Sequence, residues 1–330
     1  MRIERFTTRH RARRYDMRKP RFRISLRAIV LLVLSVTCVA SFWMLLDYAI
    51  DYFRAKKAAN DLREIYYAAT DTPAPTVHVT ATPQPVTAVP VATPVPAITP
   101  IPVNQNKLPT VYYPGNASAR VSSRFSALQR QNKDIIGWLR IDEMLDEPVV
   151  QRDNSYYLRR DYRGYHNTNG AIFLDEGCSL KTRPYTLVLY GHNMKTGAMF
   201  GSLRNFENLT YYKNNPLISF DSAYEDGRYV IFSISTVSTK TSDLHFFSFA
   251  KLNSANISLR KDAIDKLKQL SVFACPVDVR PDDQLLLLVT CVDDPDDRRI
   301  IAARRLRPGE IELRVKEQVS GSYKNGPGFY

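Results

Sequence analysis

An uncharged apolar run near the N-terminus constrains this chain more than any other feature of its sequence. Ala28 to Leu46 is a stretch of nineteen residues without a charge. As a helix it would span roughly 28 Å at about 1.5 Å per residue, close to the ~30 Å hydrocarbon core of a bilayer. Trp43 and Tyr48 lie at its C-terminal end, where aromatic side chains favour the membrane interface. The run predicts one transmembrane helix.

The positive charge of the chain is concentrated beside this run. The sequence has 46 Lys and Arg against 33 Asp and Glu, a formal net charge of +13, and residues 1–27 hold eleven of the basic residues and two of the acidic ones. A nucleic-acid-binding protein would present basic residues on a folded face. Because Lys and Arg are enriched on the cytoplasmic side of a span, we expect a basic cytoplasmic tail at 1–27, a single-pass anchor in the cell membrane at 28–46, and an extracellular remainder.

Three other interpretations of the run are weaker. A buried core helix rarely follows so basic a tail. A cleaved signal peptide would have a shorter apolar region and a clearer small-residue cleavage site than Cys38-Val39-Ala40. A lipoprotein site at Cys38 is disfavoured because Thr37 precedes it. We therefore expect an uncleaved anchor.

The anchor is followed by two segments that differ in composition. Residues 47–69 have a helix-forming composition with mixed charge, which predicts a juxtamembrane helix. Residues 70–117 are predicted to be an extracellular Pro/Thr-rich linker, because 72–106 contain no Asp, Glu, Lys or Arg and hold nine of the twenty prolines. Such a segment favours an extended, polyproline-like conformation that reaches up to about 110 Å. A stalk for a folded domain and an insert without a specific role both fit this composition.

The composition becomes globular from about residue 118, and we expect a folded domain at 118–316 and a flexible tail at 317–330. Helices are predicted at 123–132 and 261–270. Many short strands with few helices favour a mostly β barrel or sandwich. The predicted strands are 134–141, 147–151, 171–174, 186–190, 229–235, 285–290, 300–306 and 311–315.

Four cysteines in 330 residues exclude a disulfide-framework protein. Cys178 lies in a predicted loop and Cys275 precedes a proline, and their spacing leaves open whether they form a disulfide. No Cys/His pair has metal-ligand spacing, so we expect neither a metal nor another cofactor.

The most apolar run outside the membrane segment ends in a cysteine. Leu285–Val289 continues into Thr290 and Cys291, breaks into Val-Asp-Asp-Pro-Asp-Asp, and Arg299 then opens a new strand. If these strands are antiparallel neighbours, Cys291 and Arg299 lie at the same sheet edge. A guanidinium beside a thiol favours the thiolate and can stabilise an oxyanion. A core cysteine with a surface arginine is the structural alternative.

One histidine is placed to act with these two groups. Thr186–Tyr190 is a buried-strand pattern that stops at Gly191, and glycine permits a sharp turn that presents His192 at the strand end. The other histidines of the folded domain, His166 and His245, lie in a polar loop and beside a Phe-rich stretch. With the thiol and the guanidinium, His192 would complete a set of nucleophile, proton carrier and anion stabiliser.

At these residues the sequence resembles the class B sortases, which are membrane-anchored cysteine transpeptidases of Gram-positive bacteria. The resemblance covers residues 123–306 in order. The matching stretches are Phe125-x-x-Leu128-x-x-x-Asn132-x-Asp134-Ile135-Ile136-Gly137-Trp138-Leu139-x-Ile141, Pro148-Val149-Val150-Gln151, Asp153-Asn154-x-x-Tyr157-Leu158, Gly170-Ala171-Ile172-Phe173-Leu174-Asp175, Tyr190-Gly191-His192-Asn193-Met194-x-x-Gly197-x-Met199-Phe200-x-x-Leu203, and Leu288-x-Thr290-Cys291 followed by Arg299.

The resemblance implies a fold and a set of site residues. The fold is the eight-stranded sortase-type β-barrel with a few short helices, here preceded by the transmembrane helix. The implied catalytic residues are His192, Cys291 and Arg299. Arg299 is preferred to Arg298 because it directly precedes the Ile-Ile strand, as the family arginine does. The family often has Ser or Thr two residues before the cysteine, and here that residue is Val289. The residues implied to border the peptide-binding groove are Asn154, Leu158, Tyr190 and Thr290.

The resemblance also implies an activity. Such an enzyme cleaves the C-terminal sorting signal of secreted proteins through a cysteine thioester. It then transfers the acyl group to an amine of a cell-wall precursor or of a pilin. The alternative from another class of protein is a stalked extracellular binding or adhesion module, in which Cys291 would be unreactive.

Overall fold

The computed structural model describes residues 25–69, 113, 116, 118–181, 184–291 and 296–325, with Cys291 placed by its backbone alone. The chain divides into two compact units, Met1–Ala49 and Ile50–Tyr330. The described part of the first unit consists of the N-terminal portion of helix α1 (Leu26–Ala68), whose apolar side chains are exposed. Among the described residues, α1 is the one helix long and apolar enough to cross a membrane, which fits the predicted anchor.

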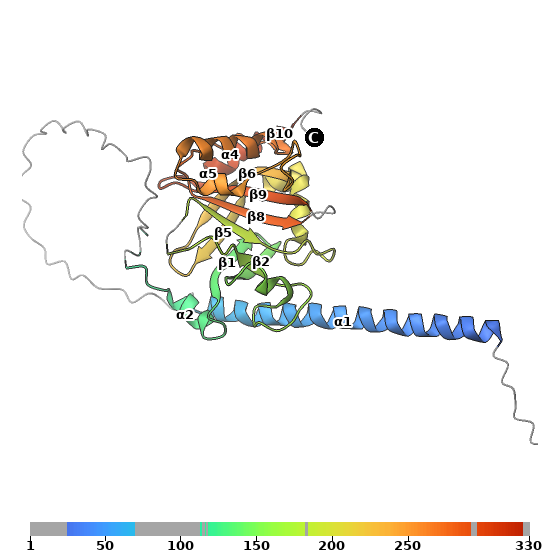
Figure 1. Ribbon diagram of the computed structural model, residues 1–330. Helices are drawn as coiled ribbons and strands as arrows, with labels where there is room; N and C mark the ends of the chain where they lie inside the picture. Colours follow the sequence, from blue (N-terminus) through green and yellow to red (C-terminus); the bar gives the residue numbers. More distant parts are fainter. Residues whose placement is uncertain are drawn as a thin grey trace, which may run out of the picture. The chain divides into compact units, whose positions relative to one another are not determined.

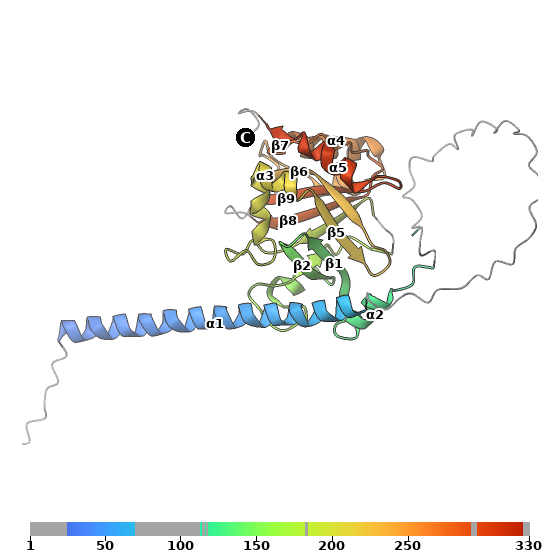
Figure 2. The same cartoon turned by 180° about the vertical axis from the view of Figure 1, so that it is seen from behind.

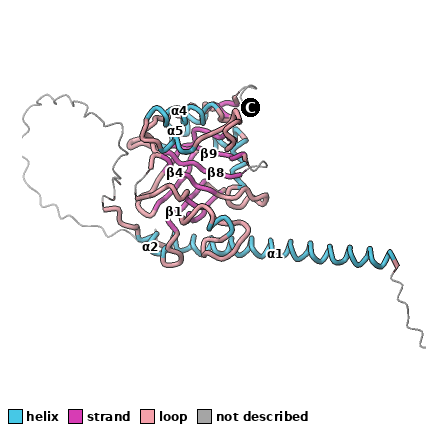
Figure 3. The backbone as a smooth tube through the Cα atoms, viewed as in Figure 1, coloured by secondary structure: helices cyan, strands magenta, loops and turns pink. Residues whose placement is uncertain are grey.

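The second unit is built around a closed barrel of eight strands in the order β1-β2-β3-β4-β8-β9-β6-β5 (Figure 1). Figure 3 shows these strands gathered into one body. Neighbouring strands are antiparallel, except that β2 and β3 and also β4 and β8 are parallel. The predicted eight-stranded barrel is therefore confirmed. The strands are β1 (Ile135–Ile141), β2 (Leu145–Val150), β3 (Ile172–Leu174), β4 (Thr186–Tyr190), β5 (Leu217–Ser222), β6 (Arg228–Ser238), β8 (Leu285–Cys291) and β9 (Asp297–Arg305).

The two most apolar strands lie side by side in the wall of the barrel. β4 and β8 pair in parallel from Thr186 opposite Leu285 to Tyr190 opposite Val289. Leu285–Val289 are at most 2% exposed. A strand that is covered on both faces has no polar face, and this explains why both segments are almost continuously apolar. Their shared direction brings the C-terminal ends of both strands to the same edge of the barrel.

Helices cover the barrel on two sides, and Figure 2 shows α4 and α5 together on the side opposite α2. The predicted helices at 123–132 and 261–270 correspond to α2 and α4. A short two-stranded sheet pairs β7 with β10. The remaining elements are α2 (Ser123–Gln129), α3 (Leu209–Asn214), α4 (Ile257–Gln269), α5 (Glu312–Ser320), the 3₁₀ helices η1 (Tyr156–Arg159), η2 (Gly201–Glu207) and η3 (Phe249–Asn253), and β7 (Phe273–Ala274) and β10 (Tyr323–Lys324).

The structure corrects the prediction near the C-terminus, because 311–315 is not a strand. Ile311 and Leu313 are 56% and 65% exposed, whereas Val315 and Val319 are buried one helical turn apart in α5. Apolar residues alternate at 311, 313 and 315, as they would in a strand. The residues that are actually buried are instead spaced as in a helix. Regular structure also continues to Lys324, within the segment 317–330 for which a flexible tail was predicted; residues 326–330 lie outside the described residues.

The C-terminal half of α1 packs on the barrel, which the sequence did not indicate. Its buried residues recur every three or four positions, as expected for one helix face. Tyr66 stacks on Trp138 of β1 with ring centroids 4.4 Å apart, and its hydroxyl donates to Asp221 of β5. Arg63 donates to the backbone oxygen of Asp146 in β2 at 2.6 Å. The buried residues of this half are Asp51, Ala55, Ala58, Ala59, Leu62 and Tyr66.

The predicted linker at 70–117 lies for the most part outside the described residues, but both of its flanks contact the same folded unit. Before it, α1 packs on the barrel up to Tyr66. Near its C-terminal end, Tyr113 is 3% exposed, donates to the backbone oxygen of Leu180 and stacks on Tyr224. Both flanks of the linker are therefore packed on this folded unit.

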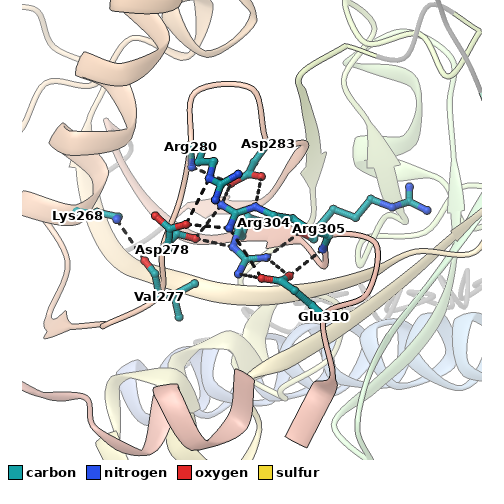
Figure 4. A network of polar contacts seen from close by, with 9 residues as sticks. Lys268, Val277, Asp278, Arg280, Asp283, Arg304, Arg305 and Glu310 are labelled. Atoms are coloured by element: carbon teal, nitrogen blue, oxygen red, sulfur yellow. Dashed lines mark hydrogen bonds and ion pairs between the residues drawn. The ribbon is translucent and has the colours of Figure 1, made fainter. Parts of the chain in front are cut away.

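A buried arginine network fixes the far end of the β8–β9 hairpin (Figure 4). Arg304 of β9 is 1% exposed, and its guanidinium donates to both carboxylate oxygens of Glu310 at 2.6 and 2.8 Å. Its Nε donates to the backbone oxygen of Asp278 at 2.6 Å. Arg307 binds Asp278 and Asp283. Bidentate, charge-assisted bonds of this kind hold a rigid geometry, so β9 is anchored opposite to the end where Cys291 lies.

The packing of α1 predicts which N-terminal truncations the folded unit tolerates. Removal of residues 1–46 should leave the melting temperature unchanged, because the buried face of α1 begins at Asp51. Removal of residues 1–69 should lower the melting temperature by about 5–10 °C, since a fully buried leucine such as Leu62 is worth about 1.5–3 kcal/mol and Tyr66 adds to it. Thermal melting of the two truncated chains beside the full chain tests this. Equal stability of all three would show that α1 contributes no packing energy.

Candidate active site

His192 stands in the turn that follows β4. The strand ends at Tyr190, and the amide of Gly191 still donates to the backbone oxygen of Val289 at 3.3 Å. A Cβ on Gly191 would lie 2.8 Å from the ring of Phe200, so only glycine lets the chain turn against this ring. The structure thus places His192 at a strand end, as the sequence predicts.

The imidazole of His192 has a defined orientation. Its Nε2 lies 2.7 Å from the backbone oxygen of Leu158 in η1. A carbonyl oxygen can only accept a hydrogen bond, so Nε2 carries a proton in this arrangement. Nδ1 is then the ring nitrogen through which His192 can exchange a proton with a reacting group.

Strand pairing decides which arginine lies opposite Cys291. In the antiparallel ladder of β8 and β9, Cys291 is paired with Arg298, and Thr290 is paired with Arg299. Directly opposite residues share a face of a sheet, and successive residues alternate between faces. Arg298 therefore occupies the face of Cys291, whereas Arg299 occupies the face of Thr290. The predicted placement of Cys291 and Arg299 at one edge holds, but the directly opposite residue is Arg298.

The two arginines have different surroundings. Arg299 donates from Nε at 3.0 Å and from Nη2 at 2.5 Å to one carboxylate oxygen of Glu207 in η2, and its side chain is only 12% exposed. Arg298 donates from Nη1 to the backbone oxygen of Asp297 at 2.8 Å. Burial and then the carboxylate of Asp175 raise the pKa of the Tyr190 phenol, and Arg298 opposes this rise. Arg298 thus acts electrostatically on Tyr190, a residue predicted to border the groove.

Three of the four predicted groove residues lie on one part of the barrel surface. Leu158 is 39% exposed, and its backbone oxygen holds His192. Tyr190 is half-buried, with its ring 5.5 Å from that of Phe173. Asn154 donates to Asp175 at 3.1 Å and accepts from the amide of Glu176 at 2.9 Å. Asn154 therefore joins the loop before η1 to the segment after β3.

Thr290 differs from these three. Its side chain is 2% exposed, and its hydroxyl has no hydrogen-bond partner among the described residues. A buried side chain offers no surface to a peptide, so the contact of Thr290 with substrate stays a prediction that would involve its backbone.

Two other cysteines lack the features of a nucleophile. Cys178 and Cys275 are both free thiols, so the disulfide that the sequence left open is not formed. Burial raises the pKa of the Cys178 thiol to about 11, and burial also raises that of Cys275. A thiol whose pKa is raised holds little thiolate at neutral pH. Both fit a structural role.

Comparison with known proteins identifies the family. A family model described as the sortase domain matches residues 139–306, and these residues contain His192, Cys291 and both arginines. Sortase B of Listeria monocytogenes is 31% identical over 183 residues, which are 55% of this chain and 72% of that protein. The chain belongs to the class B sortases. Sortase B of Staphylococcus aureus is 30% identical over 190 residues, 56% of this chain and 75% of the relative.

A solved structure agrees with this assignment. The Staphylococcus aureus sortase B–substrate complex is 28% identical, covers 58% of this chain and 88% of its own, and superposes with a TM-score of 0.51. The class B sortase reading of the sequence is confirmed, and with it an enzyme, a cysteine transpeptidase, rather than a stalked binding module.

Sequence reasoning missed three contributions to this site. The backbone oxygen of Leu158 orients His192, whereas the prediction was only that Leu158 borders the groove. Gly170 packs beside His192, as described below. Asp175 binds Asn154 and acts on Tyr190. Gly170 and Asp175 both lie in a stretch that belongs to the resemblance, so the sequence indicated that this stretch matters. The contact of the Leu158 carbonyl with His192 could not be predicted, because a backbone contact does not depend on the residue type.

Proposed function

We propose that this sortase cleaves the C-terminal sorting signal of secreted proteins through a thioester on Cys291 and transfers the acyl group to an amine. The observation that carries the proposal is the pairing of Cys291 with Arg298 at the edge of the barrel where the β4 turn presents His192. A nucleophile, a cation and a proton carrier at one edge are what acyl transfer requires.

The first half-reaction forms the thioester. The Cys291 thiolate attacks a backbone carbonyl carbon, and the resulting oxyanion is held by a guanidinium and by backbone amides. His192 in its imidazolium form donates the Nδ1 proton to the leaving amine as the C–N bond breaks, because Nε2 is engaged with Leu158. The products are the thioester and a free amine.

The second half-reaction restores the enzyme. An incoming amine attacks the thioester, and neutral His192 accepts its proton at Nδ1. The C–S bond breaks, and the thiolate of Cys291 leaves as a new amide forms.

For the oxyanion, the register supports Arg298 rather than Arg299. Arg298 shares the face of Cys291 and acts on Tyr190. Arg299 shares the face of Thr290 and is paired with Glu207. We therefore assign the anion-stabilising role to Arg298 and a structural ion pair to Arg299. Leu158 and Tyr190 would border the peptide groove. Asn154 would hold one side of it in place through its hydrogen bonds to Asp175 and Glu176.

The membrane segment is consistent with the proposed cleavage of sorting signals. The basic tail favours a cytoplasmic N-terminus and an extracellular catalytic unit in the cell membrane. A sorting-signal substrate that is itself held at the membrane would meet the enzyme on a surface, and such tethering raises the effective concentration of both.

A transpeptidation experiment with the full chain in detergent micelles tests the proposed function. The enzyme is mixed with a pool of synthetic peptides that represent C-terminal sorting signals. Two acceptors are supplied separately, triglycine for a cell-wall α-amine and Nα-acetyl-lysine amide for a pilin side-chain amine. Mass spectrometry should detect a peptide joined to one acceptor and an acyl-enzyme that forms without acceptor. A Cys178→Ala enzyme should behave like the wild type. Absence of both products from a folded enzyme, over a pool covering many sorting signals, would contradict the proposal.

A further inference from the structure

We propose that Asp51, on the half of α1 that packs on the barrel, is a positioning residue for His192. The inference rests on the catalytic role proposed above for His192. It makes the helix that follows the membrane anchor part of the support of the active site.

Asp51 makes the polar contacts between α1 and one turn of the barrel. Asp51 is 5% exposed. Its Oδ2 accepts hydrogen bonds from the amide of Thr168 at 3.2 Å and from the Thr168 hydroxyl at 3.3 Å. The backbone oxygen of Asp51 accepts from the side-chain amide of Asn167 at 2.7 Å. Within the described part of the chain, every hydrogen bond between α1 and the turn 167–170 involves Asp51.

The turn has little other support on the side of α1. Asn169 is 1% exposed, and its Oδ1 has no hydrogen-bond partner among the described residues. It lines a cavity of about 260 Å³ together with Tyr52 and Lys56 of α1 and the turn at 196–199 that follows His192. Among the described residues, the bonds of Asp51 are therefore the polar connection between α1 and this turn.

The other side of the same turn contacts the catalytic histidine. Gly170 has φ +63°, a conformation that glycine adopts without strain. A Cβ on Gly170 would lie 2.7 Å from the backbone oxygen of Leu158 and 3.1 Å from Cδ2 of His192. Leu158 supplies the oxygen that holds Nε2 of His192. The turn therefore packs against both the imidazole and the carbonyl that orients it.

These contacts form a short path from α1 to His192. Asp51 holds Thr168, and the turn closes through the bond from the amide of Gly170 to the oxygen of Asn167 at 3.2 Å. Gly170 then contacts His192. Loss of the Asp51 carboxylate leaves the amide of Thr168 without its acceptor, and a turn that shifts moves the surface against which the ring rests. Small displacements of a catalytic group cost rate rather than binding.

The experiment compares three variants of the full chain in detergent micelles. Asp51→Ala removes the acceptor, whereas Asp51→Asn keeps an oxygen that Thr168 can use. Tyr66→Phe is the matched control, because it removes a hydrogen bond between the same helix and the barrel, at Asp221, away from His192. The peptide that acylates the wild type best is the substrate for kcat and KM. Thermal melting reports stability, and long-range ¹H–¹⁵N spectra of histidine-labelled protein at pH 9 report which nitrogen of His192 bears the proton.

We expect Asp51→Ala to lower kcat by about tenfold with KM within about twofold, and to shift the His192 spectrum away from the Nε2-protonated form. Asp51→Asn should recover most of the rate. Tyr66→Phe should lower the melting temperature but change neither kcat nor the spectrum. An Asp51→Ala enzyme with wild-type kcat and spectrum would overturn the inference, and so would an equal loss of kcat in Tyr66→Phe. If the wild type forms no acyl-enzyme, the proposed function fails, and the spectrum alone decides the role of Asp51.

Discussion

Replacement of Cys291 by alanine should abolish thioester formation and transpeptidation while the protein remains folded. Loss of the nucleophile in an enzyme that works through a covalent intermediate costs at least about 10⁴-fold in rate. Alanine is close to cysteine in size and is tolerated in a strand, and Cys291 is the last residue of β8, so we expect the barrel to fold. The measurement is intact mass of the enzyme after incubation with the selected peptide in the absence of an amine.

The matched control for this variant is Cys178→Ala. Cys178 is buried beside β4, and its thiol donates to the backbone oxygen of Thr186 at 3.6 Å. Its removal should cost some stability but leave acylation intact, which is the reverse of the Cys291 result. Capture of the peptide as a thioester by the Cys291→Ala enzyme would remove Cys291 from the mechanism.

The second large effect is expected at Arg298. Arg298→Ala should lower kcat/KM by roughly a hundredfold, since a charge-assisted bond to a developing oxyanion is worth on the order of 3 kcal/mol. Arg299→Ala should mainly affect stability, by about 1 kcal/mol or less, because its ion pair with Glu207 is half-exposed on the carboxylate side. Arg298→Lys should recover little, because a planar fork is replaced by a point charge.

Glu207→Gln shows whether an effect of replacing Arg299 comes from loss of the ion pair with Glu207 or from a catalytic role of Arg299. This variant breaks the ion pair but keeps both arginines, so it should reproduce the stability loss of Arg299→Ala without a loss of rate. The readouts are kcat/KM with the selected peptide and thermal melting for all four variants. If Arg299→Ala is the more damaging to rate while both arginine variants remain folded, the catalytic cation is Arg299 and the register argument fails.

The choice between these arginines illustrates what the sequence can and cannot predict. The apolar run Leu285–Val289 predicted a buried strand, and the break after Cys291 predicted its end. Alternation along a strand placed Arg298 and Arg299 on opposite faces. Which of them shares the face of Cys291 depends on the pairing register, and a shift of one residue reverses the answer. That register became visible only with the ladder between β8 and β9.

The membrane segment and the packing of α1 make a similar contrast. The length and apolar character of 28–46 were sufficient to predict a span, and the composition of 47–69 to predict a helix. The buried face of that helix contains alanines and a charged residue, Asp51, so its pattern did not distinguish a packed helix from a solvated one. The position of Asp51 beside Thr168 is a tertiary contact between residues more than a hundred positions apart.

The most direct test of the catalytic assignment is the site of covalent modification by a peptidyl electrophile. The full chain is treated briefly with a chloromethyl ketone built on the selected peptide, and the adduct is located by peptide mass spectrometry. The assignment predicts one equivalent per chain, on Cys291, with slower modification in a His192→Gln enzyme and none in Cys291→Ala. A folded enzyme modified instead at Cys178 or Cys275, or modified at Cys291 at the same rate without His192, would contradict it.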